Sequence, residues 1–146
     1  MIMRILICLG LLLLMGSCNS FGDSSENENT KFVYDLYHPS EMSLLMNHML
    51  LVNDSIKKQI IAGEIPKDFP REFLAIDTAV MSDTKFRTDI FDAYSKVLIE
   101  NQKDLFDISN EVPLIDKYNN TINTCIACHK TECVGPIPKI EKLLIH

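Results

Sequence analysis

The sequence predicts an all-α domain, arranged as an antiparallel four-helix bundle. Between residues 41 and 129, apolar residues recur at the three- and four-residue spacing that places them on one face of a helix. No segment shows a convincing alternation of apolar and polar residues, which is the pattern of a half-buried strand. Four amphipathic helices with short connections bury their apolar faces most simply against one another.

The first predicted helix begins at Ser40 and Glu41, because a small hydroxyl residue and an acid suit an N-terminal cap and first turn. It ends at Ala62 and Gly63, since glycine commonly follows the last turn of a helix. Seven apolar residues share its predicted buried face: Met42, Leu45, Met46, Met49, Val52, Ile56 and Ile60.

Two further helices are predicted in the middle of the chain. Residues 64–70 contain two prolines and form a connection. Residues 71–80 form a short second helix, whose apolar residues include Phe73, Leu74 and Ile76. Residues 82–84, Ser-Asp-Thr, can cap the third helix. Its predicted apolar face consists of Phe86, Ile90, Ala93, Tyr94, Val97 and Leu98.

The last helix is predicted to start near Pro113 and carries the run Cys125-Ile126-Ala127-Cys128-His129. Its apolar face holds Ile115, Tyr118, Ile122, Cys125, Ile126 and His129. The pattern C-x-x-C-H is the attachment signature of a c-type haem: both thiols form thioethers with the porphyrin, and the imidazole binds the iron. We therefore expect one covalent haem c on the C-terminal helix, held by Cys125 and Cys128, with His129 as an iron ligand.

Other uses of a C-x-x-C pair fit less well. A zinc site usually needs a second pair of ligands, and Cys133 with the other histidines does not supply one at zinc-finger spacing. A thioredoxin-type pair would follow a βαβ pattern, which the sequence lacks. A buried cysteine pair beside an incidental histidine is the remaining alternative. Cys133 has no disulfide partner left, and we expect it to be a packed thiol.

Residues 1–17 have the pattern of an export signal. One base, Arg4, precedes an apolar run over residues 5–15, which is too short for a bilayer span of roughly 20 residues. The run ends in Gly-Ser-Cys, like the lipobox of a bacterial lipoprotein, which predicts lipidation of Cys18. An ordinary cleaved signal with an incidental Cys18 is the alternative. We expect a protein of the bacterial cell envelope, periplasmic or surface-facing, and lipid-anchored to a membrane.

The rest of the chain divides at about residue 31. Residues 18–31 are polar and acidic, which predicts a flexible tether, and residues 32–146 form one domain. The chain has 14 basic and 20 acidic residues and a net charge of −6; without Arg4, 13 bases remain and the charge is −7. This balance argues against nucleic acid as a partner and favours redox partner proteins with basic surfaces. The oligomeric state stays open, a homodimer included. No nucleophile with a base and no phosphate-binding loop is evident, so an enzyme is not indicated.

Together, these residues resemble the class II cytochromes c, which comprise the cytochrome c′ group and its low-spin lipoprotein relatives. In that family the haem motif lies on the final helix of a four-helix domain. The resemblance extends from the helix start at residues 40–42, through Gly63-Glu64 and Tyr118-Asn119-Asn120, to Cys133, Gly135-Pro136-Ile137 and Lys139-Ile140. It implies that the first helix faces the iron opposite His129, with a methionine ligand in low-spin members and an apolar side chain in cytochrome c′.

Three methionines of the first helix, Met42, Met46 and Met49, share one face, although such a stripe is also typical of core packing. Met46 is central and is our predicted second iron ligand, while His48 lies off that face. We expect a one-electron carrier with His and Met ligands. The first alternative is a five-coordinate protein that binds or senses NO or CO. The second alternative is a haem subunit of a larger exported redox complex.

Overall fold

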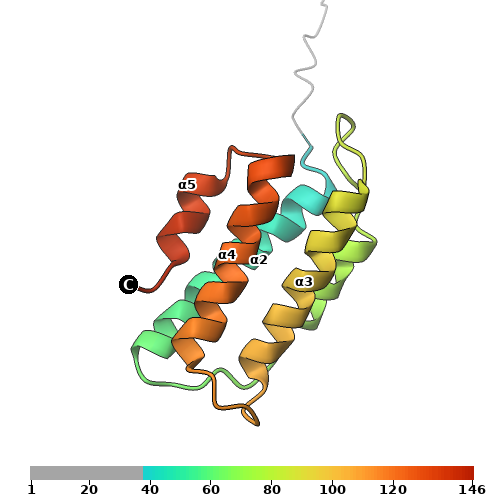
Figure 1. Cartoon of the computed structure of the whole chain (residues 1–146). Helices are drawn as coiled ribbons and strands as arrows, with labels where there is room; N and C mark the ends of the chain where they lie inside the picture. The colour runs from blue at the N-terminus through green and yellow to red at the C-terminus, as the bar shows by residue number, and fades with distance from the viewer. Residues whose placement is uncertain (1–37) are drawn as a thin grey trace, which may run out of the picture. The chain divides into compact units, whose positions relative to one another are not determined.

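The computed structural model describes residues 38–146, and the secondary structure within this range is entirely helical (Figure 1). The prediction of an all-α domain is therefore confirmed for this part of the chain. Its elements are three long helices, α2 (Glu41–Ile61), α3 (Asp89–Phe106) and α4 (Leu114–Glu132), with the shorter η2 (Arg71–Asp77), α5 (Ile137–Ile140) and η3 (Glu141–Leu143). The predicted signal over residues 1–17, the lipidation site Cys18 and the tether over residues 18–31 lie outside the described residues.

Helix α2 begins and ends as its sequence predicts. The hydroxyl of Ser40 accepts a hydrogen bond from the backbone N–H of Ser43 at 3.1 Å and so caps the first turn. The chain leaves the helix through Gly63, whose φ of +78° is a left-handed conformation that favours glycine. The buried face consists of Met42, Leu45, Met49, Asn53, Ile56 and Ile60.

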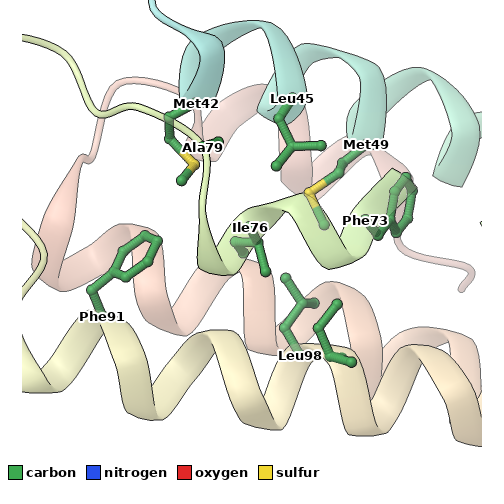
Figure 2. Packing of buried hydrophobic residues seen from close by; sticks show 9 residues of the cluster. Met42, Leu45, Met49, Phe73, Ile76, Ala79, Phe91 and Leu98 are labelled. Carbon is green, nitrogen blue, oxygen red and sulfur yellow. The ribbon is translucent and has the colours of Figure 1, made fainter. Parts of the chain in front are cut away.

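The predicted second helix over residues 71–80 is wrong in type and length. The structure has a 3₁₀-helix, η2, over Arg71–Asp77. Phe73, Ile76 and Ala79 are buried at a spacing of three, which matches the three residues per turn of a 3₁₀-helix, whereas Leu74 is exposed. Figure 2 shows η2 with Ile76 between residues of α2, such as Met49, and residues of α3, such as Leu98.

The predicted start and buried face of the third helix are also wrong. Thr88 caps α3 by accepting a hydrogen bond from Phe91 N–H, while Ser82 from the predicted cap pairs with the Ser40 hydroxyl. Of the predicted apolar face, only Leu98 is buried, and Phe86 is 78 % exposed in the preceding loop. The face that α3 buries instead contains Phe91, Ser95, Leu98, Ile99, Gln102 and Leu105.

Helix α4 starts after Pro113, as predicted, and lies beside α3 in the opposite direction (Figure 1). Tyr118 and Ile122 are fully buried, whereas Ile115 at the first turn is exposed. After α4 the chain turns back, and α5 with η3 packs against α4 (Figure 1). This C-terminal segment buries Ile140 and Leu143, and the sequence analysis did not predict it.

The buried apolar residues form two clusters. The first joins α2, η2 and α3 and includes the residues drawn in Figure 2. The second joins the C-terminal half of α2 to the end of α3, to α4 and to the α5 and η3 segment. Two partly buried residues, Val52 and Cys125, pack against both clusters.

Candidate functional site

A partly open cavity of about 280 Å³ lies where the two clusters meet. Its walls come from α2, α3, the last turns of α4 and the C-terminal segment, and they are mostly apolar. The size is near the lower end of the roughly 300–1,000 Å³ of small-molecule sites. Together with Ile76 of η2, residues from α2 at one end of the described chain to η3 at the other therefore converge on one place.

The three residues of the C-x-x-C-H motif all line this cavity. Cys125, Cys128 and His129 stand at positions i, i+3 and i+4 of α4, so they share one face of the helix. Both cysteines are free thiols. Continuous helix through the motif thus presents two thiols and one imidazole to the same apolar space.

A hydrogen bond selects which tautomer the neutral ring of His129 adopts. Its Nδ1 lies 2.9 Å from the backbone carbonyl oxygen of Cys133, which stands just beyond the last residue of α4. Because a carbonyl oxygen can only accept, Nδ1 carries the proton and Nε2 keeps its lone pair. A ring held in this way by a second partner is typical of histidines that bind metals. The arrangement leaves Nε2 available as an iron ligand.

Burial favours the neutral thiol form of both cysteines of the motif. Burial raises the pKa of Cys125 to about 12. Burial, with the Glu132 carboxylate as a smaller cause, raises the pKa of Cys128 to about 11. Since the thiolate is the nucleophilic form, neither sulfur reacts readily near neutral pH once the helix has packed. Cys133 is instead exposed, so the expectation of a packed thiol is wrong at that position.

Met46 lines the same cavity from α2. Met49 also contributes to the wall, but it is 6 % exposed and belongs to the first core cluster; Met42 is buried there too and does not line the cavity. His48 lies outside, where its Nε2 is 3.0 Å from the Glu72 carboxylate. Of the candidate second ligands, Met46 and Met49 are thus the two placed in the cavity wall.

A buried polar group adjoins the cavity at Asn53. The Asn53 side chain lines the wall and donates to the Met49 carbonyl at 2.9 Å, and its own backbone carbonyl accepts from the Tyr118 hydroxyl at 3.0 Å. The Gln102 amide donates weakly to Asn53 Oδ1 at 3.5 Å. These bonds tie α2 to α3 and α4 beside the cavity. The sequence analysis placed Tyr118 on the buried face of the last helix, but it did not predict any role for Asn53 or Gln102.

The sequence analysis also gave no site role to the C-terminal wall. Gly135, Pro136, Lys139, Ile140 and Leu143 all line the cavity. The sequence holds only a weak signal here: Ile137, Ile140 and Leu143 recur at a spacing of three, but the segment is too short for that spacing to predict a helix.

Comparison of the chain with protein-family models, curated proteins and solved structures finds no match. Within residues 38–146, no three His, Cys, Asp or Glu side chains gather into a group that could hold a metal ion. No helix in this same range is both long enough and apolar enough to cross a bilayer.

Proposed function

We propose that the chain is an exported mono-haem c-type cytochrome that carries single electrons. The observation that supports this best is the shared cavity: Cys125, Cys128 and His129 from α4 and Met46 from α2 line one apolar space. The proposal also takes α2, η2, α3 and α4 as the members of an antiparallel four-helix bundle of the class II cytochrome type, with η2 as a short member. Export and a lipid anchor at Cys18 complete it and rest on the sequence of residues 1–31.

The residues present fit a haem. An apolar lining suits a porphyrin face, two adjacent thiols suit its two vinyl groups, and the free Nε2 of His129 suits its iron. A haem supplies reversible one-electron exchange between ferric and ferrous iron when it is bound. Cys125 and Cys128 would hold it, His129 would bind the iron on one side, and the Met46 thioether would favour the ferrous state on the other.

The closing experiment is acid-acetone extraction of the full chain, produced in a host that attaches c-type haem. Wild-type protein should keep its haem, because thioether bonds survive extraction. The double variant Cys125→Ala and Cys128→Ala should release any haem it binds. Cys133→Ala is the matched control, since this thiol is exposed and outside the motif, and it should behave as wild type. Wild-type protein that releases its haem, or carries none, would contradict the proposal.

A second function is favoured if Met46 does not bind the iron. Beside Met46, the α2 wall presents Leu50, which offers no ligand, and Met49, whose side chain packs in the first core cluster. The same wall would then form an apolar pocket for NO or CO over a five-coordinate iron. Binding of carbon monoxide to the wild-type ferrous protein distinguishes the two functions, because a bound methionine blocks that position.

A further inference from the structure

We propose that Lys139 binds a propionate of the haem and so marks where the acid groups of the cofactor lie. This inference rests on the proposed function and adds a subsite that the haem motif does not define. Lys139 is the one charged side chain among the residues that line the cavity in the described part of the chain. The other residues that line the cavity have apolar or uncharged polar side chains, apart from the imidazole of His129.

The chemistry of the ligand requires such a residue. A haem has an apolar ring and two carboxylates, and an ionised carboxylate is costly to bury in an apolar space without a partner. The chain itself carries a net charge of −6, so its summed charge does not attract an additional anion. A haem bound in this cavity would therefore be most stable with its two carboxylates directed toward Lys139.

The local fold keeps Lys139 available for this contact. Pro136 stands at the N-cap of the short helix α5, and Ile140 of this helix is buried in the second core cluster with residues of α4, which fixes the segment as a wall of the cavity. The Lys139 side chain is exposed, and its ammonium makes no ion pair or hydrogen bond with any residue from 38 to 146. Lysine ammonium groups commonly bind anionic oxygens of this kind.

The test compares three variants of the haem-loaded full chain at one applied potential, with the ferrous-to-ferric ratio read from the absorption spectrum. Removing a cation beside the propionate leaves more negative charge near the iron and so favours the ferric form. Lys139→Gln should lower the ratio about two- to fivefold, the size expected for one partly solvated ion pair. Lys139→Arg should restore most of it, and the effect should shrink in high salt.

Lys142→Gln is the matched control, because Lys142 is exposed, lies three residues further along the same segment and does not line the cavity. It removes the same charge and should leave the ratio close to that of wild type. Equal shifts in the two glutamine variants, or no shift in either, would overturn the assignment of Lys139. Covalent haem in the wild type with no effect of Lys139→Gln refutes this inference alone, whereas a wild type without covalent haem refutes the proposed function as well.

Discussion

Substitution of Met46 by leucine tests which residue completes the coordination of the iron. Met46 lines the cavity and is only partly buried, at the edge of the first core cluster. Leucine has a similar volume and no thioether, so we expect the free energy of unfolding to change by less than about 1.5 kcal/mol. The fold should thus survive while the ligand disappears.

The matched control is Met49→Leu, which removes a second thioether from the same cavity wall. Met49 is 6 % exposed and packs among Phe73 and Ile76, so this change should cost at least as much stability as Met46→Leu. The two variants therefore separate the loss of a ligand from the loss of packing.

The assay is the absorption spectrum of the ferric and ferrous protein, followed by titration with carbon monoxide. Wild type and Met49→Leu should be low-spin and resist carbon monoxide, whereas Met46→Leu should be high-spin and bind it readily. A high-spin wild type would remove the carrier function in favour of gas binding. Loss of the low-spin spectrum in Met49→Leu alone would keep the mechanism and refute the choice of Met46.

Three further predictions concern single residues. Tyr118→Phe should lower the free energy of unfolding by about 1 kcal/mol in urea titrations, because the hydroxyl bond to Asn53 is lost, while Tyr94→Phe should change it less. Burial raises the pKa of Tyr118 in the folded protein. The neutral Tyr118 side chain therefore contributes to the free energy of unfolding below about pH 10, and this contribution is lost as the pH rises above that value. Tyr118→Phe has no ionisable hydroxyl, so its free energy of unfolding should fall less than that of the wild type at alkaline pH. His129→Ala should change the haem spectrum, and an unchanged spectrum would exclude it as a ligand. Cys18→Ser should abolish incorporation of labelled palmitate, and equal labelling of the wild type and the variant would make Cys18 incidental.

The boundaries of α2 and the start of α4 followed from local chemistry that the sequence displays. A hydroxyl at Ser40, a glycine at Gly63 and a proline at Pro113 act on their own backbone neighbourhood, so no knowledge of the tertiary structure was needed. The C-x-x-C-H motif is similarly local, because its five residues fix one another's spacing on α4. These features are predictable since each depends on contacts within a few residues.

The buried face of α3 was not predictable in the same way. Apolar residues occur in adjacent pairs, Ile90 with Phe91 and Val97 with Leu98, so two neighbouring faces have similar periodicity. Packing against η2 and α2 buries Phe91 and Leu98 and leaves Ile90 and Val97 exposed. Only the tertiary contacts distinguish the two faces.

The role of Lys139 escaped the sequence analysis for a related reason. Its place at the cavity depends on the turn after Cys133 and on the burial of Ile140 and Leu143 against α4. A helix of four residues is too short to show a periodicity that would predict this packing.

The arrangement of the core in two clusters bears on the order of folding and cofactor attachment. The cavity wall draws on both clusters, with Phe91 and Leu98 from one and Ile140 and Leu143 from the other, and Cys125 packs against both. A group bonded to Cys125 would contact both core clusters and link them further. Attachment would have to precede this packing, because burial raises the pKa of both thiols once the helix has packed. An attached cofactor would complete the packing around the cavity. Chains without the cofactor would keep this part of the core incompletely packed, and we expect proteases to cleave them preferentially.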